Sequence, residues 1–546
     1  MHDGTAAPPP RAMHLGDFQV SPRMLTITAI AIPIGATAAL AADGLLKLIG
    51  LITNLVFYQR IRTDLIAPGA GGHPWWLTLC APVLGGLIIG LMARYGSEKI
   101  RGHGMPEAIE AILVGGSRVA PRVALLKPAS AAISIGSGGP FGAEGPIIMT
   151  GGAIGSILAQ LLHLSADERK TLLVAGSAAG MAATFDAPLA AILLAVELLL
   201  FEWRPRSFVP VAAAVVTGTL LRWWLLGNTA VFALPAPPTA PGTANTVLAL
   251  IPGGITGGLL AIAVTALVYC AEDMFGRLPV HWMWWPAIGG LIIGIGGLIE
   301  PRALGVGYDV IDRLLTGHAT VDLIVGILVV KSLIWGLSLG SGTSGGVLAP
   351  VFMIGAALGA AEGGLLPHSA PGFWALCGLA AVVGGVMRSP LTGIVFTCEL
   401  TQAWADLLPL VVSAVAAYAV SVLWLKRSVL TEKIARRRLH LTREYSIDPL
   451  ETSFAHEVMT PGDVAEGTGP LVHPDSTLRE VADLLATHEH TRAAVVDRAD
   501  PDRLLGEITV AQLLAARRRD VHEDRHRERL LGFRSRTGVS RTTRSR

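Results

Sequence analysis

Apolar segments follow one another along the chain from Met24 to Leu425, separated by short polar or glycine-rich stretches. Segments of about 20 apolar residues are long enough to cross a bilayer as helices. Others, such as Glu107–Val114, are too short to cross, and many contain Gly or Pro, which membrane helices tolerate. Short, interrupted helices surround the binding sites of many transporters. The pattern therefore predicts an all-α polytopic membrane protein with several broken helices.

Composition supports a membrane location and divides the chain into regions. Only 15% of the residues are charged, the mean hydropathy is +0.55 and the formal net charge is +2. Soluble proteins carry about 25% charged residues. Residues 1–22 are polar and proline-rich, and we interpret them as a cytosolic segment and not as a secretory signal. We expect a membrane domain at 23–438 and a linker at 439–454 before a soluble C-terminal region.

Three short motifs place glycine and proline at the start of an apolar segment. They are Gly102-His103-Gly104-Met105-Pro106, Gly142-Ala143-Glu144-Gly145-Pro146 and Gly346-Val347-Leu348-Ala349-Pro350. Proline is favoured at the first helical position, and glycine lets a ligand approach the backbone. A helix N-terminus offers free N–H groups and a positive dipole end to an anion. We therefore expect three helix starts around one small anion, with Glu144 at the place where the anion would lie.

The chain also contains an internal repeat. A shift of 204 residues superposes residues 136–155 on 340–359 with nine of twenty positions identical, and a shift of 202 superposes Glu197 on Glu399. A repeat of this length is typical of transporters. We expect repeat one at about 24–225 and repeat two at about 246–425. Inverted repeats are favoured, because helix starts from opposite faces can then point at one midplane site.

These motifs resemble those of the CLC family of chloride channels and proton/chloride exchangers, which are G-S-G-x-P, G-[K/R]-E-G-P and G-x-F-x-P. The resemblance covers about residues 24–437. It implies a homodimer, one anion pore per subunit and about eighteen helices of uneven length. It also implies that the three motifs bind the anion.

The gating glutamate of the family falls on Glu144. A carboxylate at a helix N-terminus can itself occupy an anion site, and protonation removes its charge. Competition between a proton and chloride for one place would link their movements. The alternative is that Glu144 only caps the first turn of its helix.

Four positions depart from the family pattern. His103 replaces serine, and it could either donate an N–H to the anion or cap its helix while the backbone binds. Ala143 replaces a basic residue, which removes a positive charge from the pore mouth. Leu348 replaces phenylalanine, although its backbone N–H can still serve. Leu430 aligns with the tyrosine that closes the inner gate, so the hydroxyl of that gate is absent.

The position after Glu197 bears on proton coupling. Family exchangers usually have a second acid there that hands protons to the cytosol, whereas this chain has Leu198. Glu202 lies four residues further on, and we expect it on the same helical face. It could relay protons, or it could form a surface ion pair with Arg204 or Arg206. Glu197 and Glu399 could pair with local backbone or with a cation, and Glu197 is a second relay candidate.

The C-terminal region is soluble in character. Residues 455–515 resemble a single CBS motif, for which we expect a βαββα unit with a helix at Ser476–Thr487 capped by Asp475 or Ser476. Such motifs pair to hold adenine nucleotides, but the usual ribose-contacting aspartate is Gln512. We therefore expect dimer support and no nucleotide. Residues 516–546 are rich in Arg, Ser and Thr and are expected to be disordered.

Several function classes remain open at this stage. Chloride/proton exchange is favoured, a voltage- or pH-gated chloride channel without proton coupling is the alternative, and a fluoride exporter of the same fold is a third. No His-Glu-x-x-His or comparable cluster predicts a metal or an enzyme, and we expect no cofactor and no nucleic-acid partner. The expected location is the inner or plasma membrane, with both termini cytoplasmic and arginines near lipid head groups.

Overall fold

The computed structural model describes residues 18, 21–232, 234, 244–439, 448–462, 469–500 and 502–517. The chain divides into two units, Val20–Arg443 and a second unit made of Met1–Gln19 and Glu444–Arg546. The predicted disorder of the arginine-rich tail concerns residues that, from 518 onward, lie outside the described part. The same holds for most of the polar segment at 1–22 and for residues 440–447 of the expected linker.

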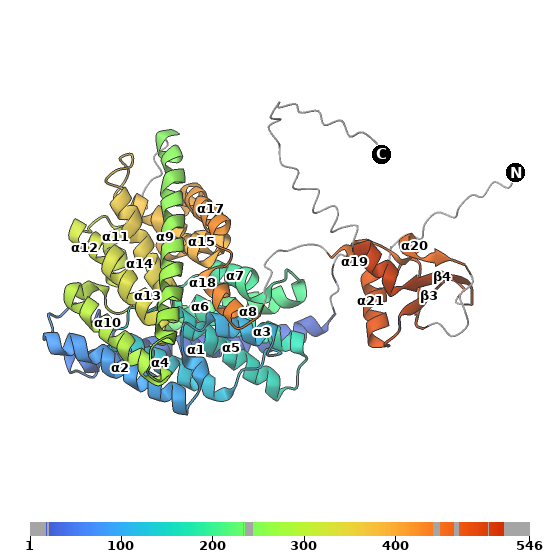
Figure 1. Ribbon diagram of the computed structural model, residues 1–546, viewed down its shortest axis with the longest axis horizontal. Coiled ribbons are helices and arrows are strands. Elements are labelled where there is room, and N and C mark those ends of the chain that lie inside the picture. The colour runs from blue at the N-terminus through green and yellow to red at the C-terminus, as the bar shows by residue number, and fades with distance from the viewer. Residues whose placement is uncertain are drawn as a thin grey trace, which may run out of the picture. The chain divides into compact units, whose positions relative to one another are not determined.

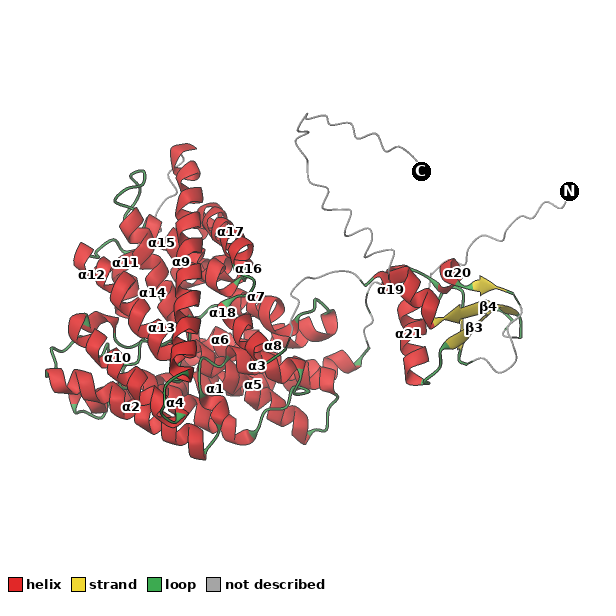
Figure 2. Ribbon diagram, viewed as in Figure 1, coloured by secondary structure: helices red, strands yellow, loops and turns green. Residues whose placement is uncertain are grey.

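The first unit is helical throughout its described residues, which confirms the predicted all-α membrane fold (Figures 1 and 2). Repeat one contains α1 (Arg23–Tyr58), α2 (Trp75–Tyr95), η1 (Glu98–Ile100), α3 (Met105–Leu113), α4 (Pro121–Gly136), α5 (Glu144–Leu161), α6 (Ala166–Phe185), α7 (Pro188–Leu194), η2 (Ala195–Leu200) and α8 (Pro205–Leu226). Repeat two begins with α9 (Ala244–Gly276), η3 (Trp282–Trp284), α10 (Trp285–Ile299), η4 (Pro301–Ala303), α11 (Tyr308–Leu315), α12 (Val321–Gly326), η5 (Ile327–Lys331) and α13 (Ser332–Gly340). It continues with α14 (Leu348–Glu362), α15 (Phe373–Met387), α16 (Pro390–Thr401), η6 (Trp404–Asp406) and α17 (Leu407–Trp424), and α18 (Val429–Arg436) follows.

Helix lengths are as uneven as the hydrophobic pattern predicts. Seven segments of the described chain are long and apolar enough to cross a membrane: Arg23–Tyr58, Trp75–Tyr95, Pro205–Leu226, Asn245–Gly276, Trp282–Ile299, Val321–Gly340 and Trp404–Arg436. Leucines on their outer faces are exposed: Leu84 is 58% and Leu423 is 81% accessible. Helices α3, α5, α6, α14 and α15 lie in the interior, where most of their residues are buried.

The two repeats pack in the same way. In repeat one α1 contacts α6 and α8 while α5 contacts α6, and in repeat two α9 contacts α15 and α17 while α14 contacts α15. Glycine identities noted in the repeat explain these contacts. A Cβ on Gly151 would overlap the carbonyl of Gly176, and a Cβ on Gly378 would overlap that of Gly355. Small residues let helices approach closely in membranes, so the repeat preserves two equivalent close crossings.

The second unit is a small α+β fold. It contains α19 (Pro449–Thr452), α20 (Ala455–Val458), β1 (Thr460–Pro461), β2 (Leu471–Val472), α21 (Leu478–Thr487), β3 (Arg492–Val496) and β4 (Leu504–Thr509). The sheet order is β1-β4-β3-β2, in which only the β2–β3 pair is parallel. The predicted helix starts later than expected, because the hydroxyl of Thr477 accepts from the Glu480 N–H and caps it. Neither Asp475 nor Ser476 is therefore the cap.

Candidate anion site

The three glycine-proline loops meet in the interior of the membrane unit. The Gly102 N–H donates to the carbonyl of Thr343 at 3.0 Å, which joins the first loop to the strand-like segment before the third. Gly142 and Gly346 exchange two hydrogen bonds, of 3.3 and 2.7 Å, in a short antiparallel bridge. Every residue of the three motifs is buried. The sequence prediction that the loops lie together therefore agrees with the geometry.

The helix starts differ in one detail from the expectation. Helices α5 and α14 begin at Glu144 and Leu348, so Pro146 and Pro350 are their third residues and not their first. Pro106 is the second residue of α3. Proline is tolerated at all three positions because the first N–H groups of a helix have no partner inside the helix.

Glu144 reaches from its own helix to the start of another. Its Oε1 accepts from the backbone N–H of Leu348 and from that of Ala349, the latter at 3.2 Å. These are the first two residues of α14, and the side chain is only 1% accessible. Its Oε2 has no partner among the described residues. The carboxylate thus occupies the position that a bound anion would take at the α14 N-terminus.

His103 does not cap its helix. The N–H of Gly104 donates to Oε2 of Glu107 at 3.1 Å, so Glu107 is the cap of α3. The alternative of a capping imidazole is therefore wrong. The His103 ring is 4% accessible, and its Nδ1 has no partner in the described part of the chain. A buried ring nitrogen without a partner is available to a ligand.

Two buried lysines hold equivalent loops in the two repeats. The Nζ of Lys127 donates to the carbonyls of Ile100 and Gly102 at 2.8 and 2.6 Å. The Nζ of Lys331 donates to the carbonyls of Ala303 and Gly305 at 2.8 and 2.7 Å. Both side chains are completely buried. Sequence reasoning missed this pair, although the 204-residue shift that aligns the second motif with the third also aligns the two lysines.

Glu197 and Glu399 each cap a helix of the opposite repeat. Glu399 accepts from the N–H groups of Leu189 and Ala190, in the first turn of α7, at 2.9 and 2.8 Å. Glu197 accepts from the backbone N–H of Thr392, in the first turn of α16, at 2.9 Å, and from the hydroxyl of the same residue at 2.5 Å. All but one of these partners are backbone groups, and none of them is local. The exchange is reciprocal, as a two-fold relation between the repeats requires.

Comparison with known proteins identifies the family. The model described as "Voltage gated chloride channel" matches residues 85–422, more than half of the chain. The chain belongs to the CLC family of chloride channels and transporters. A second model, the CBS domain, matches residues 455–519. The protein is a multi-pass membrane protein of a transport family and not an enzyme.

Curated CLC relatives cover most of the membrane unit. A "Putative chloride channel protein ClcB-like" from Ralstonia nicotianae is 29% identical over 419 residues, 73% of this chain and 97% of the relative. An "H(+)/Cl(-) exchange transporter ClcA" from Citrobacter koseri is 32% identical over 365 residues, 63% of this chain and 75% of the relative. The ClcA of Yersinia pestis (strain Angola) is 32% identical, with 52% of this chain and 62% of that protein aligned.

Solved CLC structures share the fold. A slow cyanobacterial Cl⁻/H⁺ antiporter superposes with a TM-score of 0.65 at 22% identity, covering 77% of this chain and 99% of its own. A CLC-type fluoride/proton antiporter gives 0.64 at 20% identity, covering 76% and 98%. At these identities the likeness establishes architecture alone, which confirms the predicted CLC-type membrane fold.

The region after Glu197 differs from the expected CLC helix. Segment η2 is a π-helix that ends at Leu200, and Phe201 has a left-handed φ of 55°. Glu202 therefore lies in the turn before α8, and the expectation of a shared helical face is wrong. Its carboxylate accepts from the Ser207 hydroxyl at 2.6 Å and lies 3.6 Å from Lys170. Arg204, one of the two expected ion-pair partners, is 3.7 Å away.

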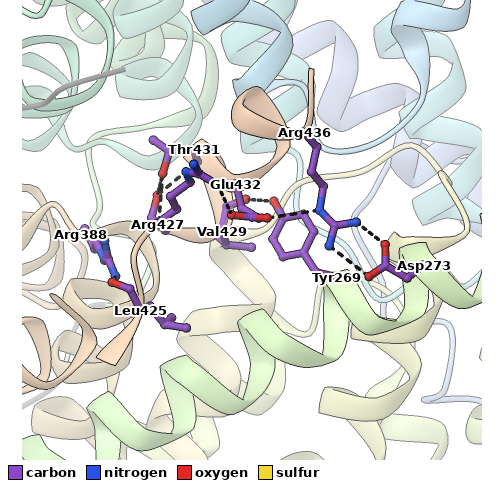
Figure 3. A network of polar contacts seen from close by, with 10 residues as sticks. Tyr269, Asp273, Arg388, Leu425, Arg427, Val429, Thr431, Glu432 and Arg436 are labelled. Atoms are coloured by element: carbon purple, nitrogen blue, oxygen red, sulfur yellow. Dashed lines mark hydrogen bonds and ion pairs between the residues drawn. The ribbon is translucent and has the colours of Figure 1, made fainter. Parts of the chain in front are cut away.

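Leu430, which the sequence predicts to align with the inner-gate tyrosine of the family, is fully buried in the first turn of α18. A tyrosine from another helix is close by: the Tyr269 hydroxyl donates to the carbonyl of Val429 (Figure 3). Arg436 lies over the ring of Tyr269 at 4.7 Å and pairs with Asp273 at 2.5 Å. These contacts attach α18 to α9, a connection that the sequence did not suggest.

Helix α18 is also attached to the first motif. The helix-capping Glu107 lies 3.1 Å from Lys433 and 3.0 Å from Arg437. Arg437 also pairs with Glu110. These ion pairs join residues more than 320 positions apart, and they place the charges of α18 beside the loop that carries His103.

Proposed function

We propose that this protein exchanges chloride for protons and that Glu144 is the group through which both ions pass. The observation that carries the proposal is the carboxylate of Glu144 on the first N–H groups of α14. A charged carboxylate there excludes chloride electrostatically and sterically. A protonated carboxylate is neutral and can leave the start of α14. Chloride can then bind there, so the charged carboxylate and chloride occupy the site in turn.

The first motif supplies the second part of the anion route. The neutral imidazole of His103 can donate one N–H to chloride, in place of the serine hydroxyl of the family. The unpartnered and buried Nδ1 supports this role. The remaining motif residues bind through backbone N–H groups, which attract an anion without the full charge that would trap it.

Protons need an exit on the side away from Glu144. Leu198 is buried and cannot carry a proton. Glu202 has a side chain that is 20% accessible, and it contacts one hydroxyl and two cationic side chains. We propose Glu202 as the exit group, reached through water.

Replacing Glu202 tests this exit. We expect Glu202→Gln to lower proton flux about fivefold or more while chloride flux persists, since the amide cannot release a proton. Asp167→Asn, an exposed acid on α6, is the matched control. Proton-to-chloride flux ratios in liposomes give the answer. An unchanged ratio in Glu202→Gln would remove Glu202 from the route and leave its ion pairs as its role.

A substitution at Gly346 tests whether the Glu144 carboxylate must lie at this position to control the chloride flux. A Cβ on Gly346 would overlap Oε1 of Glu144. We expect Gly346→Ala to displace the carboxylate and to make chloride flux about tenfold less sensitive to pH, because proton and chloride no longer compete. Chloride efflux across pH 4–8 measures it. Gly364→Ala, where the nearest atom is 3.7 Å away, is the control. A folded Gly346→Ala protein with the wild-type pH profile contradicts the proposed gate position.

A chloride channel without proton coupling is the second candidate, and Leu198 is the observation that favours it. The decisive experiment records chloride and proton movement together in liposomes. An outward chloride gradient that drives protons uphill supports exchange, whereas chloride flow without proton movement supports the channel. Fluoride flux without chloride flux would point to the fluoride branch of the family.

We further propose a homodimer with both termini in the cytoplasm, in the inner or plasma membrane. Basic residues cluster at and after α18, including Lys433, Arg436 and Arg437, which suits a cytosolic face. The CBS-like unit is proposed to support the dimer without nucleotide. Gln512 accepts from Thr509 and donates to Val458 and Thr460, so its amide is already used inside the unit.

A further inference from the structure

A cavity of about 510 Å³ lies directly beside the first motif. Gly102 and His103 form part of its wall, and Tyr269 and Arg436, both visible in Figure 3, form another part. A water molecule takes about 30 Å³ in the liquid, so the cavity can hold a hydrated anion with several waters.

Five cationic side chains line this cavity: Lys99, Arg101, Lys433, Arg436 and Arg437. Three of them come from the α18 region and are already engaged by carboxylates. Lys433 and Arg437 pair with Glu107, and Arg436 pairs with Asp273. Their charges are largely compensated where they stand.

Arg101 is different, because aromatic rings and not carboxylates hold it. Its guanidinium lies 4.8 Å from the ring centre of Trp282 and 5.5 Å from that of Trp285. Stacking uses the faces of the guanidinium and leaves the N–H groups at its edge free. Its Nε has no accessible surface, so only the terminal Nη groups can serve a ligand in the cavity, and no carboxylate of the described residues pairs with the guanidinium within 4.0 Å. Glu98 and Glu272 line the same cavity at longer range.

A glycine packs directly against this guanidinium. Gly342, in the loop before the third motif, has a φ of +84°, and a Cβ there would lie 2.9 Å from Nε and Nη2 of Arg101. Any other residue would press on the guanidinium. The arrangement is a cation fixed on the wall of the cavity, one residue before Gly102.

We propose that Arg101 is an anion-recruiting ligand: chloride binds the edge of its guanidinium in this cavity before moving to His103. The proposal rests on the anion transport proposed above and adds a residue to its route. Compared with the family pattern, the positive charge lies at a different motif. The second motif lacks the basic residue of the family at Ala143, while Arg101 supplies a cation next to the first motif.

The test compares Arg101→Gln with Arg101→Lys in the full-length protein in liposomes. We expect Arg101→Gln to raise the chloride concentration for half-maximal flux about three- to tenfold at low ionic strength, with little change in the maximal rate. Added impermeant salt should narrow the difference. Arg101→Lys, which keeps the charge but not the stacked fork, should fall between the two. Arg118→Gln, an exposed arginine outside the cavity, makes the same change of net charge and should behave as wild type.

An unchanged half-maximal concentration in Arg101→Gln overturns the proposal. So does a loss of maximal rate and of thermal stability together at constant half-maximal concentration, since that result assigns Arg101 to packing of the tryptophans alone. Failure of the wider transport proposal looks different, because wild-type protein would then show no chloride flux at all.

Discussion

Glu144→Gln is expected to abolish proton movement while chloride continues to flow. Glutamine has nearly the same shape but neither charge nor a transferable proton, so it can neither carry a proton nor exclude chloride electrostatically. We expect proton flux to fall at least tenfold, to background, and chloride flux to become independent of pH. Parallel recordings with a pH electrode and a chloride electrode on proteoliposomes measure both.

The control for this variant is Asp312→Asn, which neutralises an exposed acid on α11. It should keep the wild-type ratio of chloride to protons. If Glu144→Gln also kept that ratio, protons would follow a route that does not include Glu144, and the carboxylate on α14 would be a helix cap alone.

Lys127→Met carries the second large effect. Its ammonium is fully buried and donates to two loop carbonyls, those of Ile100 and Gly102. Methionine fills a similar volume but leaves both carbonyls without a donor, at about 1–3 kcal/mol for each unsatisfied buried group. The variant also removes the desolvation cost of a buried charge, which offsets part of this loss. We therefore expect a net loss of roughly 2–4 kcal/mol in the free energy of unfolding. Thermal unfolding in detergent measures the change.

Lys331→Met provides a control that few proteins offer. It makes the same change in the other repeat, where the lysine donates to Ala303 and Gly305. Both variants should lose comparable stability. Only Lys127→Met should also raise the chloride concentration for half-maximal flux, because only its loop carries His103. Equal effects of the two variants on chloride would show that stability, and not the first motif, governs the response.

The sequence predicts the architecture well because the signals for membrane-spanning and broken helices each lie within a single segment of the chain. Apolar runs of sufficient length mark the crossing helices, and glycine with proline marks the broken ones. The repeat at 136–155 and 340–359 then pairs the halves. Glycines shared by the two copies, such as Gly151 and Gly355, are required by close helix crossings. Apolar length and the positions of glycine and proline can each be read from one segment of the chain, without knowing what that segment contacts.

The polar partners could not be predicted in the same way. Glu399 caps α7 from about 210 residues away, and Glu107 meets Lys433 from the far end of the membrane unit. Neither contact leaves a periodic signal. Local rules also failed where the backbone turned: Glu202 follows Leu198 by four residues, yet the left-handed Phe201 takes it off the helix. The cap of α3 is a different case: Glu107, three residues beyond Gly104, stands at the capping-box position, so a local rule could have found it.

Equilibrium binding of chloride at different pH tests the competition at Glu144 most directly. Isothermal titration of the detergent-solubilised protein would be carried out between pH 5 and pH 8, for wild type and Glu144→Gln. We expect wild-type affinity to rise as the pH falls, with proton uptake on chloride binding, and Glu144→Gln to bind tightly at every pH. Equal and pH-independent affinities in the two proteins would contradict it.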